Sequence, residues 1–247
     1  MTITTLRSTL TNVISIVVFA AATSACSNST SWKEEVLLHD GKKIVVERSI
    51  SRDPKGDREI GQSAPQSEET LKFTLPGNSQ TVAWKSDFGP ELQDNLMLLA
   101  LEIVDGKPYI VTRATRCHAY NKWGRPNPPY VFFKFDGQSW QRIAIRELPK
   151  AIQKANVIIG GYGGKEERLR GMGIDAKQTS PHLTSEVVDR FNRDMGGDPD
   201  TLRMRLFDRE PIKGGETVQC AEMVFHKGAW VGPGDSIGRR IMDRKTQ

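Results

Sequence analysis

Residues that commonly bind metals are scarce in this chain. Its 247 residues include only three cysteines and four histidines. The histidines are dispersed along the sequence as His39, His118, His182 and His226. Because protein zinc sites normally need closely spaced pairs such as Cys-x-x-Cys or His-x-x-x-His, which do not occur here, the sequence predicts no metal site.

Nucleotide-binding motifs are also missing. A glycine-rich segment at 160–164 precedes Lys165, but it lacks the glycine and hydroxyl spacing of a phosphate-binding loop. Residues 171–176 match the glycine spacing of a dinucleotide-binding turn, yet they follow a charged segment rather than a strand. Adjacent carboxylates such as Glu68 and Glu69 would point to opposite faces of a strand. We therefore expect no cofactor, and the sequence favours a protein without catalytic activity.

The chain has no large excess of one charge and no long apolar run. Lysine and arginine number 35 against 30 acidic residues, giving a formal net charge of +5. This mild basicity is not the signature of a nucleic-acid-binding protein, so we expect no nucleic-acid partner. A membrane-spanning helix needs about 20 apolar residues, and no stretch of this sequence provides them.

The first 26 residues have the pattern of a secretory signal. One basic residue, Arg7, precedes the apolar run at 13–22, and small residues lead to Cys26. The segment Thr23-Ser-Ala-Cys26 resembles the lipobox of bacterial lipoproteins. This resemblance implies a signal peptide over residues 1–25, diacylglycerol on the Cys26 sulfur and an acyl group such as palmitate on its amine. In that family, Ser27 after the cysteine implies sorting to the outer membrane.

Two other interpretations of the leader remain open. Ordinary signal peptidase cleaving near residues 20–22 would leave a soluble periplasmic protein. An uncleaved anchor is disfavoured because the apolar run is much shorter than a bilayer span. We expect a lipid-anchored protein of the cell envelope, at the outer membrane, with the polar residues 26–31 as its tether.

The first half of the mature chain predicts a series of β-hairpins. Apolar runs flank three Asp-Gly pairs, which begin at Asp40, Asp105 and Asp136. Asp-Gly is a strong hairpin signal because its turn requires positive φ, which glycine readily adopts. Successive hairpins indicate a mainly β fold, an antiparallel sandwich or barrel, and the uneven spacing disfavours a propeller. The apolar run at 96–101 fits either a strand or a buried helix.

The second half predicts a helical insertion at about 148–200. The pattern at residues 148–155 predicts a short helix. A second helix, with apolar residues on one face, is expected to start at Pro181 and to end before Gly196.

Strand character returns at 217–231, with a hairpin across residues 226–229. We expect a strand there to close the sheet. Residues 32–247 would then form a single β-rich domain.

A base-rich stretch between Arg113 and Lys150 holds eight lysines and arginines against two acids. Prolines stiffen its middle, which carries the candidate binding residues Tyr120, Lys122, Trp123, Arg125 and Tyr130. Rigid aromatic rings beside cations suit a surface that binds an envelope protein, a glycan or an anionic lipid. The alternative is a rigid connection whose aromatic rings pack against the sheet.

Residues 32–48 and 119–134 resemble a group of uncharacterised proteobacterial lipoproteins in which no activity is established. The resemblance implies a location and no chemistry. The sequence therefore predicts an envelope lipoprotein that acts as a binding or structural domain. The alternative is an envelope hydrolase that acts on peptidoglycan or lipid.

Cys117 and Cys220 are the only thiols that remain if Cys26 carries lipid. Because the periplasm is oxidising, we expect a disulfide between them. The alternatives are two separate buried thiols, or a reactive Cys117 beside His118. A disulfide requires the two Cα atoms to lie within about 7 Å of each other.

Overall fold

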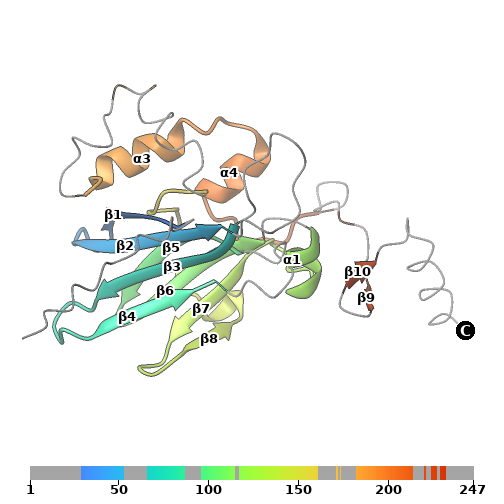
Figure 1. Ribbon diagram of the computed structural model, residues 1–247, viewed down its shortest axis with the longest axis horizontal. Helices are drawn as coiled ribbons and strands as arrows, with labels where there is room; N and C mark the ends of the chain where they lie inside the picture. Colours follow the sequence, from blue (N-terminus) through green and yellow to red (C-terminus); the bar gives the residue numbers. More distant parts are fainter. Residues whose placement is uncertain are drawn as a thin grey trace, which may run out of the picture.

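Two four-stranded antiparallel sheets form the body of the protein (Figure 1). The computed structural model describes residues 29–52, 66–86, 96–114, 117–160, 171, 173, 182–213, 220, 224–226 and 229–231. The first sheet consists of β1 (Ser29–Leu37), β2 (Lys43–Arg52), β3 (Gln66–Thr74) and β4 (Thr81–Lys85). The second consists of β5 (Leu96–Val104), β6 (Lys107–Ala114), β7 (Val131–Phe135) and β8 (Trp140–Ile143). The expectation of a mainly β fold is confirmed.

Each sheet is a meander in which consecutive strands are hydrogen-bonded neighbours. Asp-Gly pairs lie in the turns β1–β2, β5–β6 and β7–β8, as the sequence predicts. The glycines of these turns have positive φ, with 83° at Gly41, 71° at Gly106 and 107° at Gly137. Local turn chemistry therefore accounts for three of the hairpins.

The two sheets pack face to face around one apolar cluster. Val36 of β1 and Phe73 of β3 belong to the same buried cluster as Leu98, Ile110 and Phe133 of the second sheet. The opposite face of the first sheet carries exposed polar side chains, because residues alternate between the two faces of a strand.

The second sheet is buried on both faces. Leu99 of β5 and Phe132 of β7 face away from the first sheet and pack against Leu148, Ile152 and Phe207. The apolar run at 96–101 is therefore a strand, and its continuous hydrophobicity reflects burial on two sides rather than a helix.

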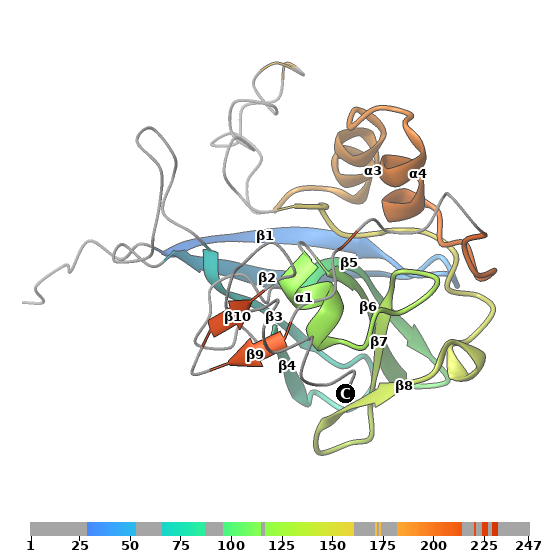
Figure 2. The same cartoon turned by 90° about the vertical axis from the view of Figure 1, so that its right-hand side faces the viewer.

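Helices lie on one side of the sheets (Figures 1 and 2). They are α3 (Ser185–Arg193) and α4 (Pro199–Arg205), while the short α1 (Cys117–Lys122) follows β6 and the 3₁₀ turn η1 (Ile145–Glu147) follows β8.

One helix expectation is wrong, and a second helix is present with a later start than expected. Residues 148–155 are not helical, since Lys154 pairs with Leu206 as an antiparallel bridge. The helix expected to start at Pro181 starts at Ser185, because Leu183 is extended and accepts a 2.7 Å hydrogen bond from the backbone N–H of Glu35 in β1. Thr184 is its N-cap, and the Thr184 side chain accepts a hydrogen bond from the backbone N–H of Val187.

The chain termini differ from expectation in two ways. Strand β1 begins at Ser29, three residues before the expected start of the domain at Trp32. The expected hairpin at 226–229 is present as β9 (Val224–His226) and β10 (Ala229–Val231), but these form a separate two-stranded sheet and do not close the main one.

None of the helices in the described part of the chain has the length and apolar character of a membrane span.

Candidate functional site

The aromatic residues of the predicted binding surface lie largely inside the protein. Tyr120 is 7% exposed and Tyr130 is 2% exposed. Trp123 is half-buried, and its ring meets Phe133 of the core edge-on at 5.6 Å between centroids. Arg142 covers the Trp123 ring at 5.3 Å. These rings therefore pack against the sheet, and only Lys122 and Arg125 of the five candidates are exposed.

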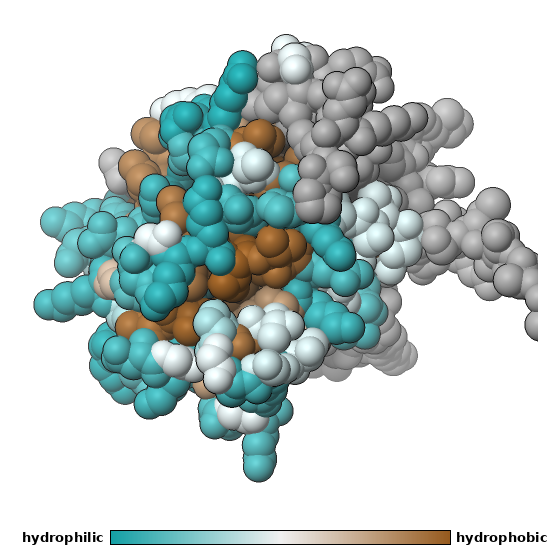
Figure 3. Space-filling model, turned by 90° about the vertical axis from the view of Figure 1, so that its left-hand side faces the viewer, coloured by the Kyte–Doolittle hydropathy of each residue, from teal (hydrophilic) through white to brown (hydrophobic). Residues whose placement is uncertain are grey.

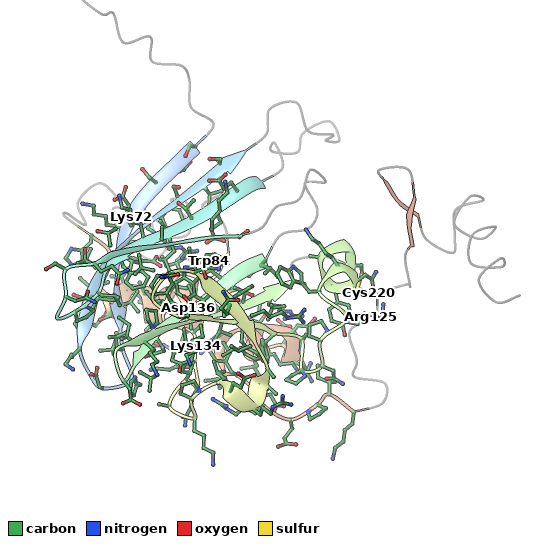
Figure 4. The ribbon with its side chains drawn as sticks, turned by 90° about the horizontal axis from the view of Figure 1, so that it is seen from below. Lys72, Trp84, Arg125, Lys134, Asp136 and Cys220 are labelled. Carbon is green, nitrogen blue, oxygen red and sulfur yellow. A yellow bond between two sulfur atoms is a disulfide. The ribbon has the colours of Figure 1, made fainter. Side chains whose placement is uncertain are left out.

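Polar groups of this loop bind a later part of the same chain. Arg125 donates a 2.9 Å hydrogen bond to the backbone carbonyl of Cys220. The Asn127 amide donates to the Ile212 carbonyl at 3.0 Å and accepts from the Ile212 N–H at 2.7 Å. Figure 4 shows Arg125 and Cys220 side by side at one end of the molecule, away from Trp84 and Lys72. The loop thus holds the segment that follows α4.

The two predicted disulfide cysteines meet at the same place. The Cα atoms of Cys117 and Cys220 are 5.3 Å apart and their sulfur atoms are bonded, across a sequence separation of 103 residues. The geometric requirement for the expected disulfide is met. This cross-link ties the start of α1 to the C-terminal part of the chain.

A second region, which the sequence analysis did not identify, has the form of a binding site. A cleft of about 1050 Å³ opens between the β1–β2 turn, the segment after β8 and the segment after α4. We call it the basic cleft. Its lining residues are Leu37, Leu38, His39, Gly41, Glu102, Ile145, Arg146, Leu148, Lys150, Ala151, Gln153, Lys154, Leu206, Phe207 and Arg209. A cleft of this volume suits a small molecule.

Four cations line the basic cleft, against one carboxylate. They are Arg146, Lys150, Lys154 and Arg209. Within the described part of the chain, none of the four forms an ion pair with a carboxylate. No described carboxylate therefore lies within ion-pair distance of these four cations.

Arg209 is the most firmly placed of these cations. Its guanidinium donates hydrogen bonds to the backbone carbonyls of Leu148 at 3.0 Å, Pro149 at 2.5 Å and Ile152 at 3.0 Å. Partial burial lowers the pKa of Arg209 from its usual value. The carbonyls position a charged group at the cleft without neutralising it.

The carboxylate of the basic cleft belongs to a hydrogen-bonded network. Glu102 Oε2 lies 3.1 Å from His39 Nδ1 and accepts the His39 backbone N–H at 3.1 Å, while the Asn156 amide donates to Oε1 at 3.1 Å. Burial raises the pKa of Glu102, and the hydrogen bonds from His39 act in the opposite direction. The network fixes the Glu102 carboxyl beside the cleft.

Apolar side chains are exposed in the same cleft. Leu206 is 57% exposed and Leu37 is 36% exposed, and both line it. Figure 3 views the end of the molecule at which the β3–β4 turn lies in Figure 1, and it shows a hollowed apolar strip between hydrophilic side chains. The protein therefore leaves apolar surface in contact with solvent at this cleft.

A third charged cluster is internal and has a structural role. Arg48 is 1% exposed, and its guanidinium binds Glu34 Oε1 at 2.9 Å, the Ile158 carbonyl at 2.7 Å and the carboxylate of Glu69. Burial raises the pKa of Glu69, while the charge of Arg48 opposes this shift. Because these groups bind each other inside the sandwich, they are not available to a ligand.

The remaining histidines do not form a site in the described part of the chain. His182 lies 3.6 Å from a Glu35 oxygen, and the side chains of His118 and His226 are outside the described residues. No group of three or more metal-binding side chains occurs among the described residues.

Sequence signals for the basic cleft are weak. Arg146 and Lys150 belong to the base-rich stretch, but Leu37, His39 and Arg209 come from distant parts of the chain. The sequence also contains Gly234-Asp-Ser-Ile-Gly238, which has the spacing of a hydrolase nucleophile elbow. This motif lies outside the described residues.

The chain was compared with family models, with curated proteins and with solved structures, and none of them matches it. Its function is therefore inferred from its own residues.

Proposed function

We propose that this chain is a lipid-anchored protein of the bacterial cell envelope whose β domain binds an anionic ligand in the basic cleft. The observation that carries the proposal is the presence of four cations without carboxylate partners around one open cleft. The lipobox resemblance at Cys26 supports the anchor. Strand β1 begins at Ser29, so two residues separate the lipidated cysteine from the folded domain.

Electrostatics supports an anion as the ligand. Like charges gathered in a cleft raise the local concentration of counterions, and the low-dielectric walls strengthen that field. An anion bound there would relieve the repulsion among Arg146, Lys150 and Lys154. Arg209 is already held in place by three carbonyls, which reduces the entropy lost on binding.

The predicted surface at residues 120–130 supports ligand binding less well. Its tyrosines are buried, and Arg125 binds the Cys220 carbonyl. Lys122 and Arg125 retain exposed charge, which leaves a contact with an envelope partner as a secondary role of this loop.

A charge-reversal variant tests the proposal. The wild-type protein, incubated with an extract of its own envelope, should carry added mass from an anionic compound in native mass spectrometry. Lys150→Glu combined with Lys154→Glu should lose at least about 90% of that occupancy, because the local charge falls by four.

The matched control combines Lys33→Glu with Lys72→Glu, which make the same charge change on the exposed face of the first sheet. This control should keep wild-type occupancy. Equal loss in both double variants, or no bound compound in the wild type, would overturn the proposal. Incorporation of an alkynyl palmitate that is abolished by Cys26→Ser checks the anchor.

One observation favours a hydrolase as the second candidate function. The Gly-x-Ser-x-Gly spacing places a candidate nucleophile at Ser236. None of the residues lining the basic cleft is a serine, threonine or cysteine. Release of product from peptidoglycan or a lipid ester, lost in Ser236→Ala, would support the enzyme.

A further inference from the structure

The basic cleft combines exposed apolar side chains, held in place by backbone pairing, with cations that form no ion pair among the described residues. We infer that its ligand is a single-chain anionic amphiphile. This inference rests on the proposed binding function and names the class of ligand. The acyl chain would lie along Leu37 and Leu206, and the anionic head group would be bound by Arg209 and the neighbouring lysines.

Leu206 is exposed because the backbone holds it so. Ala155 donates to the Arg205 carbonyl at 2.9 Å, and Phe207 donates to the Gln153 carbonyl at 2.9 Å. In such a ladder adjacent side chains point in opposite directions. Phe207 packs against the Tyr130 ring at 5.6 Å, so Leu206 is turned outward.

Leu37 is held in a similar way. It is the last residue of β1 and pairs with Lys43 of β2, while the neighbouring Val36 is fully buried in the core. The alternation of the strand therefore places Leu37 on the outer face. Two of the four large apolar side chains that are exposed among the described residues thus line one cleft, and neither can turn inward without breaking backbone pairing.

A second, smaller cavity adjoins the basic cleft at Leu37. This cavity of about 150 Å³ shares Leu37 and Lys154 with the basic cleft, and its other lining residues are Ala155, Asn156, Ser185, Glu186, Val188 and Asp189. The two carboxylates disfavour an anionic head group there. An apolar chain lying over Leu37 could extend toward this cavity. Exposed apolar side chains beside a cleft are typical of binding sites.

The head group of the ligand is expected at the Arg209 side. Arg209 donates three of its five N–H groups to backbone carbonyls, so it offers the head group a fixed positive charge and its two remaining N–H donors. Lys150 and Lys154 are exposed and add charge without fixed geometry. A fatty acid and a lysophospholipid both combine such a head with one acyl chain.

Myristate is the probe that tests the inference. The protein is the mature chain with Cys26→Ser, exported behind a leader that ordinary signal peptidase removes, so that its own lipid, the apolar leader and detergent are absent. We expect calorimetry to show myristate binding at least about tenfold more tightly than tetradecanol, which lacks the charge, or inorganic phosphate, which lacks the chain.

Matched leucine variants locate the acyl chain. Leu206→Asp should weaken myristate binding about tenfold or more, since it places a charge against the chain. Leu202→Asp is the control, because Leu202 is 39% exposed on α4 and does not line the cleft. Arg209→Gln should weaken binding to a similar extent. Lys150→Glu repeats the charge test at a side chain that makes no structural contact in the described chain, in case Arg209→Gln does not fold.

Each of these titrations has a result that would contradict one part of the inference. Phosphate binding as tightly as myristate would overturn the amphiphile inference and leave anion binding in place. Tetradecanol binding as tightly as myristate would overturn the anionic head group. If Leu206→Asp and Leu202→Asp behave alike, the acyl chain does not lie along Leu206. If no anion binds, including components of the envelope extract, the proposed function fails as well.

Discussion

The loop at residues 119–130 and the basic cleft both combine cations with apolar side chains, but the fold uses them differently. In the loop, Arg125 and Asn127 bond to backbone atoms of the same chain, and Tyr120 and Tyr130 are buried. In the cleft, the cations have no acidic partner in the described chain and Leu206 is exposed. A basic, aromatic segment is therefore a poor guide to a ligand site until the partners of its polar groups are known.

The largest expected effect concerns the disulfide beside the loop. Cys117→Ser combined with Cys220→Ser removes a cross-link across 103 residues. In the chain-entropy model this lowers the free energy of unfolding by about 4 kcal/mol. Because this disulfide ties the loop and not the cleft, myristate binding should not change. Guanidinium chloride unfolding and calorimetry measure the two quantities.

The control for the disulfide is Cys26→Ser, which should leave the unfolding of the domain unchanged. If mature protein from the envelope alkylates at both Cys117 and Cys220 without prior reduction, the bond does not form in the cell.

A smaller effect is expected at Trp123. Trp123→Ala removes the contacts of a half-buried ring with Phe133 and Arg142, which should lower the free energy of unfolding by about 2 kcal/mol. Binding in the basic cleft should persist. Thermal unfolding followed by circular dichroism measures the loss, and Trp123→Phe should reduce stability less.

Capture of crosslinked envelope partners completes the Trp123 test. A Trp123→Ala protein that is fully stable but captures none of the wild-type partners would support the loop at residues 119–130 as the binding surface. Unchanged partners together with lower stability would confirm that the ring is structural.

The smallest expected effect is on pH dependence, through Glu102 in the cleft. Burial raises its pKa above the ordinary 4.5. A carboxyl whose pKa is higher in the folded state contributes stability that is fully present below the unfolded pKa and is lost as the pH rises through the folded pKa. The wild type should therefore lose stability as the pH rises above about 4.5, and Glu102→Gln should lose less.

Free energies of unfolding between about pH 4 and pH 7 measure this difference. Burial also raises the pKa of Glu69. Glu69 is present in both proteins and contributes the same loss of stability with rising pH to each, so the difference between the two curves reports Glu102. Parallel curves for the wild type and Glu102→Gln would show that Glu102 contributes nothing to this trend.

The sequence predicted the parts of the fold that depend on neighbouring residues. Three Asp-Gly turns are where the pattern placed them, and the hairpin at 226–229 is present. Of the two helix predictions, the second is confirmed as α3 except for its start, and the first failed, in both cases where a distant segment imposed another structure. Residues 148–155 form a turn and then a bridge in which Lys154 pairs with Leu206, and Leu183 pairs with β1 in place of starting a helix.

The alternating pattern of the strands also did not reveal which charged residues are buried between the sheets. Glu34, Arg48 and Glu69 occupy inward-facing positions that alternation assigns to apolar residues. They are stable there only because each carboxylate meets the same guanidinium, and that meeting requires β1, β2 and β3 to be side by side.

By itself the sequence determined the mainly β character, the turns and the pattern that resembles a lipoprotein leader, because these follow from local backbone preferences and short motifs. The tertiary structure alone decided the location of the cleft. Arg209 reaches Leu148 only because residues 205–207 pair with residues 153–155, and Leu37 and His39 join them from the β1–β2 hairpin. Such long-range pairing depends on the packing of both sheets, which no local pattern encodes.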